Sequence, residues 1–336
     1  MQVKIILPVL LLLAFGLGLI LLDRERIIQI LGQADFGVLP RALIFVVCSN
    51  SLVSISYVIL AGSVGMQMGR LEQGTIFYVT NVMNRLVMSG GAAGFSLRYL
   101  MMKPYGVRLD DVLNTSFIHF LLGSLIMLGM LPLVVIYILL TLPVAAGMIF
   151  ALIFLAISGA LLCLGIAFFL FSERLRSSAA RLAIWLGMKV IRRDFSARVD
   201  EYTQRAAWAV AALRQDWKGF FAVMGLLLAE WGMNVIVLGY CLRAFGFGLS
   251  FGGVAAIYVV ATTAGVMTAL PGGIGIQEWM ITSLAVVQGS SFEQAALAAI
   301  LYRILQSFLP YLLSLGFYPY LLKGGATEIN PSNIRT

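Results

Sequence analysis

The stretch that decides the fold is Leu270-Pro271-Gly272-Gly273-Ile274-Gly275-Ile276-Gln277-Glu278, which interrupts an otherwise apolar part of the chain. Proline ends an incoming helix, because it lacks an N–H and its ring clashes with the preceding turn, and the glycines allow a sharp bend. A new helix can start near Ile276, with free N–H groups inside the protein. Such helix ends attract anions, and broken helices near the bilayer midplane often form transporter sites. The spacing fits neither a dinucleotide-binding loop nor a P-loop, so it does not predict a nucleotide site.

Composition places this turn in a membrane protein. Of 336 residues, 61% are hydrophobic and 11% charged, against about 45–50% and about 25% in ordinary globular chains. This excludes a water-soluble enzyme, a disordered chain and a disulfide scaffold. The net charge of +8 is explained by cytoplasmic loops and anionic lipid headgroups, so we expect no nucleic-acid partner.

Seven apolar runs are long enough to cross about 30 Å of hydrocarbon, and each predicts a transmembrane helix. They are Ile5–Leu22, Arg41–Gly62, Ser116–Leu140, Val144–Phe171, Gly219–Tyr240, Phe251–Leu270 and Ala296–Leu322. The first run ends without a small-x-small cleavage site, so we interpret it as a retained span and not a signal peptide. The expected fold is an all-α polytopic membrane protein.

Two further apolar segments, Thr75–Tyr99 and Pro271–Gln288, contain polar residues and a glycine cluster. Non-helical backbone at membrane depth survives only where protein or a wet cavity surrounds it, so both predict re-entrant elements. A charged residue closely follows each cluster, which favours an inverted pseudo-repeat with a binding site between the halves. Chance similarity of two glycine-rich loops is the alternative. The expected turn residues are Gly90, Gly91, Gly94, Pro271, Gly272, Gly273 and Gly275.

The segment Ser172–Lys218 holds ten basic residues against five acidic ones, which predicts a cytoplasmic location. Thr141–Pro143 would then face outside. Apolar residues recur in Ser172–Lys218 at helical spacing, which indicates either an interfacial helix on the inner leaflet or an ordinary cytoplasmic helical hairpin. We expect one membrane domain over 1–322, with halves at 1–171 and 219–322 around segment 172–218, and a polar tail at 323–336.

Four charges lie within apolar sequence: Arg85, Glu230, Glu278 and Arg303. Each costs about 2.5–3.5 kcal/mol to insert, so such residues usually face the bundle interior and pair. Glu278 and Arg303 lie at similar distances on either side of a short turn around Gly289–Phe292, which predicts that they meet. One interpretation is a structural ion pair; the other is a polar path for a charged headgroup, supplemented by Asn81, Asn84, Arg98 and Asn234.

Other chemistry has little support. His119 is the only histidine, so we expect a packed or hydrogen-bonded residue and no metal site. Cys48, Cys163 and Cys241 are scattered in apolar runs, which is typical of small packing residues. No catalytic triad or paired carboxylate motif occurs, and we expect neither a cofactor nor a catalytic residue.

Two motifs resemble a known family. Leu-Pro-Gly-Gly-Ile-Gly-Ile-Gln-Glu at 270–278, followed by Gln288-Gly289 and by Ala-Ala-Leu-Ala-Ala-Ile-Leu-Tyr-Arg at 295–303, looks like the C-terminal signature of the lysylphosphatidylglycerol synthase transmembrane family. Asn81-x-x-Asn84-Arg85 with Gly90-Gly91-x-x-Gly94-x-x-x-Arg98 is similar to its first-half signature, although Ser89 stands where the family has proline. The resemblance covers about residues 5–322.

The resemblance implies a polyhelical flippase-like domain in the cytoplasmic membrane, with two re-entrant elements and no enzyme activity of its own. By position, Arg85, Arg98, Glu278 and Arg303 would line the route of a phospholipid with an anionic or aminoacylated headgroup. Only Lys323–Thr336 follow the last expected span, so we expect no aminoacyl-transferase domain. The alternatives are a membrane subunit that scaffolds a lipid-modifying enzyme or glycosyltransferase, and a secondary transporter for a small anion. Homo-oligomers are compatible with all three.

Overall fold

The computed structural model describes residues 24–86, 92–142, 146–174, 177–178, 181, 210–211, 215–267 and 273–317. Within these ranges the regular structure is helical, without strands, which confirms the all-α prediction. The predicted span Ile5–Leu22 and most of the segment Ser172–Lys218 lie outside the described residues.

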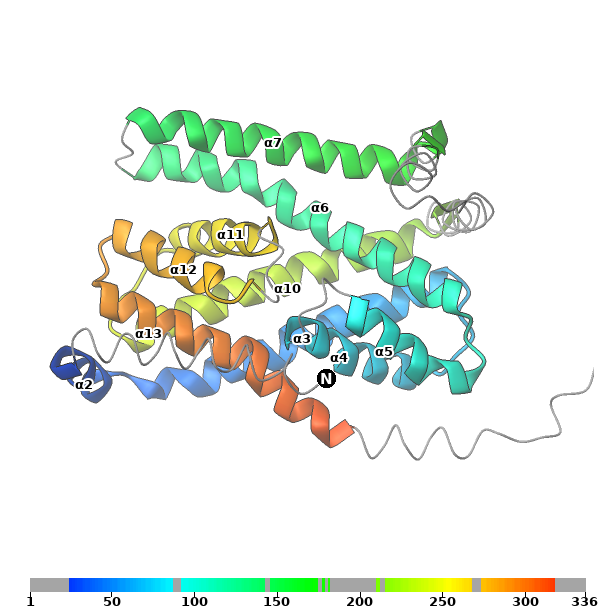
Figure 1. The fold of residues 1–336 in the computed structure, drawn as a ribbon, viewed down its shortest axis with the longest axis horizontal. Helices are drawn as coiled ribbons and strands as arrows, with labels where there is room; N and C mark the ends of the chain where they lie inside the picture. The colour runs from blue at the N-terminus through cyan, green and yellow to red at the C-terminus, as the bar shows by residue number, and fades with distance from the viewer. Residues whose placement is uncertain are drawn as a thin grey trace, which may run out of the picture.

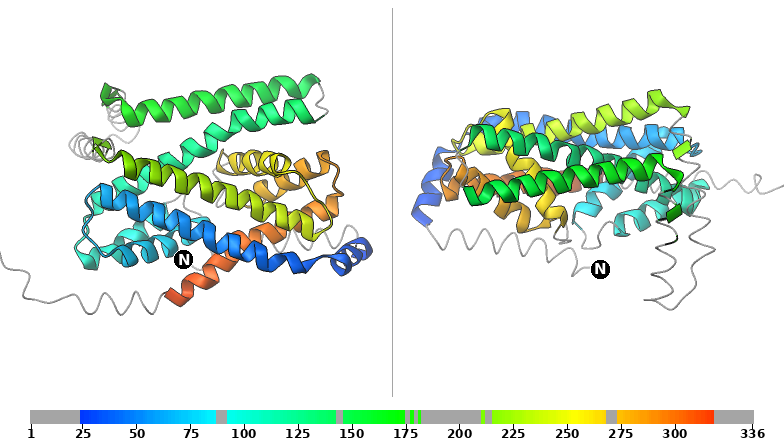
Figure 2. Two further views of the ribbon diagram at one scale, coloured as in Figure 1. Left: turned by 180° about the vertical axis from the view of Figure 1, so that it is seen from behind. Right: turned by 90° about the horizontal axis from the view of Figure 1, so that it is seen from above.

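Five helical stretches in the described ranges are long and apolar enough to cross a membrane. They match five of the predicted spans and include helices α3 (Leu39–Ser63), α6 (Leu109–Thr141), α7 (Ala146–Phe171), α10 (Trp217–Ala244) and α13 (Phe292–Arg303). These helices run roughly along one direction, with α3 packed against α10 and α6 against α7 (Figures 1 and 2). The protein is therefore a multi-pass membrane protein.

Shorter elements connect or extend these spans. The helix α2 (Arg24–Gln33) and the 3-10 turn η1 (Phe36–Val38) precede α3, and the 3-10 turn η2 (Lys103–Tyr105) precedes α6. The π-helical segment η5 (Ile304–Phe308) continues α13, and the run from α13 is helical to Phe317.

Two helical hairpins lie between the spans. The first consists of α4 (Arg70–Leu86) and α5 (Ala92–Met102), which pack on each other. The second consists of α11 (Phe251–Met267) and α12 (Ile276–Val287), and the Gln288 side-chain amide donates to the Gly253 carbonyl at 3.2 Å, which holds the base of the hairpin together. At 1.5 Å per residue, α12 is only about 18 Å long. The hairpin of α11 and α12 therefore enters and leaves at the same end of the molecule.

The structure corrects one predicted span. The run Phe251–Leu270 was expected to cross the bilayer, but α11 has only 17 residues and is the first arm of the second hairpin. The predicted re-entrant element Pro271–Gln288 is thus only the returning arm. An apolar run of this length is compatible with either structure, because composition does not reveal where a helix folds back.

The two halves have the same order of elements in opposite orientation. Helix α3, the hairpin α4–α5 and α6 in the first half correspond to α10, the hairpin α11–α12 and α13 in the second. The hairpins enter from opposite ends, and the last turn of α4 and the first turn of α12 lie toward the middle of the molecule (Figures 1 and 2). This arrangement supports the predicted inverted pseudo-repeat.

The described residues include two large cores of buried apolar side chains, one around Tyr57 and Leu122 and the other around Leu238 and Ile257, and each core contains residues of both halves. The two halves are joined where the end of α3 meets the start of α10. Asp216 caps α10 by accepting from the Gly219 N–H at 2.8 Å, and its other oxygen accepts from the Ser63 hydroxyl at 2.7 Å. Both hydrogen bonds lower the pKa of the Asp216 carboxyl, and the one from Ser63 has the larger effect.

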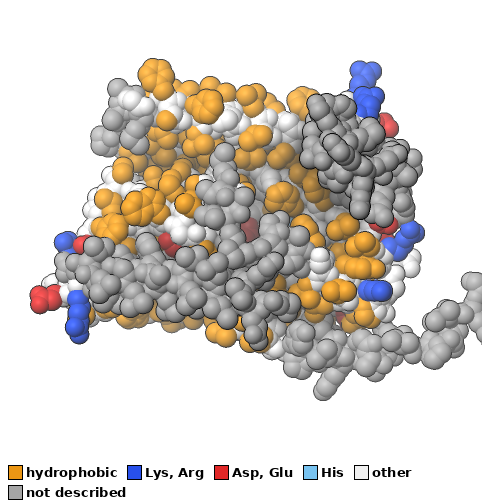
Figure 3. Space-filling view, in the orientation of Figure 1, with side chains coloured by type: hydrophobic (Ala, Val, Ile, Leu, Met, Phe, Trp, Pro, Cys, Tyr) orange, Lys and Arg blue, Asp and Glu red, His pale blue; other side chains and the backbone are white. Residues whose placement is uncertain are grey.

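Charged side chains mark the two ends of the helices. In the space-filling view, hydrophobic side chains extend between ends that carry Lys and Arg (Figure 3). The bases of the first hairpin and the start of α10 share one end, which carries Arg70, Lys103 and Lys218. Because the predicted cytoplasmic segment adjoins α10, the other end, with the base of the second hairpin, is expected to face outside.

This topology is testable by cysteine labelling in intact cells. Lys103→Cys, at the base of the first hairpin, should react only after the inner face is made accessible. Gly248→Cys, before α11, should react from outside, because both positions are exposed but lie at opposite ends. The parent chain with Cys48, Cys163 and Cys241 supplies the background. Labelling of both positions from the same side would rule out the inverted arrangement.

Candidate functional site

The turn of the second hairpin depends on two glycines with left-handed backbone. Gly273 has φ of +61° and Gly275 has φ of +86°, a conformation that glycine adopts without strain. A Cβ atom on Gly273 would also lie 2.9 Å from the Cα of Gly265 on α11, where backbone leaves no room. The structure therefore requires glycine at 273 for both conformation and space. Pro271 and Gly272 lie outside the described residues.

Glu278 and Arg303 form a buried ion pair between α12 and α13, as the sequence predicted. The Nε of Arg303 donates to Oε1 of Glu278, and only 2% of Glu278 and 7% of Arg303 are exposed. The Arg303 guanidinium also donates to Oε1 of Gln277 at 3.0 Å. The turn around Gly289, with φ of +102°, makes α12 and α13 antiparallel and brings both charges to the same height.

The second carboxylate oxygen of Glu278 accepts from the backbone N–H of Gly275 at 2.7 Å. A carboxylate at this position satisfies a backbone donor at the start of α12 and interacts well with the positive end of the helix. Glu278 therefore partly occupies the anion-attracting helix end that the sequence indicated. One side chain fixes both the turn and the packing of the next helix.

A second polar network lies beside this pair and joins both halves. Arg85, near the end of α4, donates to the backbone carbonyl of Gln306 at 3.0 Å and contacts its side-chain oxygen at 3.4 Å. The Gln306 amide donates to Asn234 on α10 at 2.8 Å. Asn234 in turn donates to Glu230 at 2.7 Å and lies 3.4 Å from the Tyr258 hydroxyl of α11. The end of α4 is thereby linked to α10, α11 and the helical segment that continues α13.

The π-helical segment η5 begins directly after Arg303 and contains Gln306. A π turn opens the hydrogen-bond ladder and is frequent at functional sites. Here the Gln306 carbonyl accepts from Arg85, a group of the other half. Gln306, Gln277 and Tyr258 were not singled out from the sequence, although Gln306 lies one turn beyond Arg303 and Gln277 directly precedes Glu278.

In the first hairpin, Asn84 stabilises the start of α5. Its side-chain oxygen accepts from the Gly94 N–H at 2.8 Å, and a Cβ atom on Gly94 would overlap the Asn84 side chain. Asn81 lies one turn before Arg85 on α4 and takes no part in the network among the described residues. Gly90 and Gly91 lie outside the described ranges.

The structure places Arg98 apart from this network. Its side chain, 2% exposed, donates to Thr80 at 3.0 Å and to Ser116 at 2.6 Å. The guanidinium carbon lies 4.3 Å from the ring centroid of Phe77 and 4.9 Å from that of Tyr57, distances at which cation–π attraction is favourable. Arg98 therefore holds α3, α4, α5 and α6 together.

His119 is a packed, hydrogen-bonded residue, as expected. Its Nε2 lies 2.8 Å from the Ser56 hydroxyl, and its ring packs edge-on against Tyr57 and Phe77. Among the described residues, no three His, Cys, Asp or Glu side chains are grouped as a metal site.

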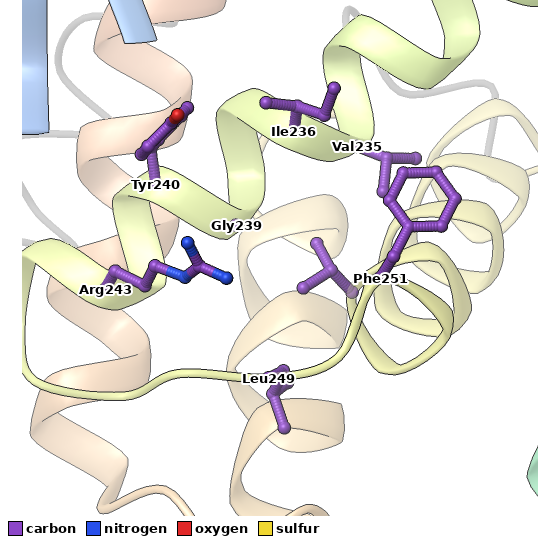
Figure 4. A pocket seen from close by; sticks show the side chains of 8 residues that line it. Val235, Ile236, Gly239, Tyr240, Arg243, Leu249 and Phe251 are labelled. Carbon is purple, nitrogen blue, oxygen red and sulfur yellow. The ribbon is translucent and has the colours of Figure 1, made fainter. Parts of the chain in front are cut away.

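A pocket of about 160 Å³ lies between the C-terminal end of α10 and the start of α11. Arg243 points into the space between α10, Leu249 and Phe251 (Figure 4). None of the charged residues predicted for the lipid path lines this pocket, and Arg243 was not singled out from the sequence.

The fold is that of a polytopic helical membrane protein in which two hairpins enter from opposite ends. A buried polar network lies between the two halves. The sequence matches the family described as the lysylphosphatidylglycerol synthase TM region over residues 5–314, and the chain belongs to this family. The resemblance predicted from the glycine motifs is thus confirmed.

One relative is the phosphatidylglycerol lysyltransferase of Bacillus subtilis (strain 168). It is 30% identical over 97 residues, which are 29% of this chain and 11% of the relative. The matched stretch thus spans about a tenth of that protein's length. Membership of the family associates the chain with membrane lipids.

We predict that Gly273→Ala impairs folding, because the added Cβ would approach the Gly265 backbone and φ is positive. Gly275→Ala should be milder, since it shares the positive φ but has open space around the Cβ position. The yield of monodisperse protein in mild detergent and the thermal unfolding temperature measure both effects. Equal effects of the two substitutions would contradict the close approach.

We also predict that Glu278 and Arg303 are energetically coupled. Glu278→Gln and Arg303→Gln should each reduce the free energy of unfolding by about 3 kcal/mol, because each leaves an unpaired buried charge. The double variant should lose at least about 1 kcal/mol less than the sum, because both charges are then absent. Strict additivity in a thermal double-mutant cycle would show that the ion pair does not form.

Proposed function

We propose that this protein moves phospholipids between the two leaflets of a bacterial or archaeal cytoplasmic membrane. The observation that carries the proposal is the network of Arg85, Gln306, Asn234 and Glu230, which joins α4 of the first hairpin to α10 and η5 of the second half. Membership of the lysylphosphatidylglycerol synthase transmembrane family supports a lipid substrate.

The depth of the network suits a transport site. Asn234 lies 17 residues into α10, which spans Trp217–Ala244, or about 26 Å along a helix of about 42 Å. Gln306 lies 14 residues into the helical run Phe292–Phe317, about 21 Å from its start. Both groups therefore lie near the middle of spans that cross the hydrocarbon. Polar groups at that depth are costly and usually serve a substrate pathway.

The charges of the network match a phospholipid headgroup. Among the described residues, Arg303 is paired with Glu278 and Arg98 is enclosed by aromatic rings, whereas the hydrogen bonds of Arg85 go to the two oxygens of Gln306. The Arg85 guanidinium can therefore exchange these neutral acceptors for a phosphate, which it binds more strongly. Glu230, which accepts from the Asn234 amide, supplies a carboxylate for the amine of an aminoacylated headgroup.

A scaffold for a lipid-modifying enzyme is the second candidate. The observation that favours it is that several charged groups already have partners inside the protein. Glu278 and Arg303 pair with each other, and Arg98 is hydrogen-bonded to Thr80 and Ser116. A scaffold needs only this rigidity. Transport additionally requires that Arg85 releases Gln306 when a headgroup arrives.

Proteoliposomes with fluorescently labelled phosphatidylglycerol or phosphatidylcholine, and a quencher added outside, distinguish the two candidates. Labelled lipid in the inner leaflet is protected from the quencher until it moves to the outer leaflet. We expect the protein to accelerate this movement, and Arg85→Gln to slow it by about tenfold or more, the equivalent of one charge-assisted hydrogen bond. Arg85→Lys should retain part of the rate.

Arg41→Gln is the matched control, because Arg41 is exposed in the first turn of α3 and lies outside the network. Rates no higher than in protein-free liposomes would exclude translocation under these conditions and favour the scaffold. A wild-type rate in Arg85→Gln would place the lipid route elsewhere.

A further inference from the structure

We infer that the groove between α10 and the start of α11 binds an anionic phospholipid of the outer leaflet, with its phosphate at Arg243 and part of an acyl chain against Gly239, Leu249 and Phe251. The inference deepens the proposed function, on which it rests, by assigning a docking site outside the central network. Its evidence is the combination of a mainly apolar groove, a cation whose side chain has no hydrogen-bond or carboxylate partner among the described residues, and the position at the end of a span.

The groove is apolar along its length and charged at one end. Val235 and Val254 are buried, Gly239 leaves space in its floor, and Leu249 and Phe251 form the opposite wall. Its volume is about 160 Å³, comparable to apolar cavities of about 150 Å³ that bind a benzene ring. A short stretch of hydrocarbon chain fits such a space, whereas a whole lipid does not, so the remainder would lie in the bilayer.

Arg243 supplies the charge complementarity. It is exposed and lies in the last turn of α10, and within the described part of the chain its side chain has neither a carboxylate nor a hydrogen-bond partner. The guanidinium points over the groove (Figure 4). A guanidinium at a membrane interface binds a phosphate through paired N–H donors. Neighbouring Tyr240 suits the same interfacial depth.

The position of the groove connects it with the central network. From Arg243 to Val235 is eight residues along α10, or about 12 Å, so the groove runs from the interface into the hydrocarbon. Its inner end reaches Val235, which directly follows Asn234 of the network. A lipid held at Arg243 is therefore placed where it can enter or leave the proposed route from the outer side.

A structural role is the competing explanation for Arg243, because a cation in the last turn of a helix interacts favourably with the helix dipole. A dipole role needs only the positive charge and does not involve the groove. Gly239 separates the two explanations. A Cβ atom there would make ordinary contact with the Val254 side chain at 3.6 Å, so Gly239→Leu fills the groove and leaves Arg243 in place.

The test measures binding of dioleoyl-phosphatidylglycerol to the full-length protein in detergent by native mass spectrometry, with dioleoyl-phosphatidylcholine for comparison. We expect preferential retention of phosphatidylglycerol, about tenfold weaker binding in Arg243→Gln, intermediate binding in Arg243→Lys, which keeps the charge but not the paired donors, and loss in Gly239→Leu. Arg41→Gln, which removes an exposed arginine at the same end of the molecule, should bind like wild type. Thermal unfolding temperatures confirm that each variant is folded.

Wild-type binding in both Arg243→Gln and Gly239→Leu would overturn the site. Displacement of the lipid by glycerol 3-phosphate at equal concentration would overturn it as well, because the anion alone would then explain the affinity. Lipid movement in proteoliposomes is measured separately. If lipid movement is absent but binding still depends on Arg243, the proposed function is refuted and the site is retained. If binding is unaltered in Arg243→Gln and Gly239→Leu while the protein transports lipid, the site is refuted and the proposed function is retained.

Discussion

The carboxylate of Glu278 is the group on which the second half of the structure depends. A carboxylate in a low-dielectric interior is stable only with partners for both oxygens, and Glu278 has the Gly275 N–H on one side and Arg303 on the other. The first contact starts α12 after a broken turn, and the second sets the register of α13. The position of η5, and with it the acceptor for Arg85, follows from that register.

The two halves share a backbone plan but use different chemistry to stabilise it. In the second half an ion pair closes the hairpin, whereas in the first half the Asn84 amide caps α5 and Arg98 is surrounded by hydroxyls and aromatic rings. The two halves therefore differ in their buried charges: the second half has an ion pair at its hairpin, and the first half has an arginine among hydroxyls and aromatic rings. The central network accordingly lies mainly on α10 and α13, and the first half contributes Arg85 to it.

Much of this organisation follows from local sequence. The length of the apolar runs predicts five of the spans. Glu278 and Arg303 lie at similar sequence distances on either side of the turn around Gly289, and this predicts their pairing. The role of α11 could not be predicted, because its composition is that of a span. The surroundings of Arg98 depend on Tyr57 and Phe77 from other helices, and Gln306 is an uncharged side chain whose position results from a π turn. Such features arise from tertiary packing, which residue patterns do not encode.

The π turn in η5 has a consequence for the whole distal part of its helix. A π turn accommodates one residue more than an α turn, so the chain beyond Phe308 is rotated by about 100° relative to an uninterrupted α-helix. In this distal part, the ring of Phe317 packs against Tyr78 of α4 with a centroid distance of 5.6 Å. The π turn thus determines which residues beyond Phe308 face the other half of the protein.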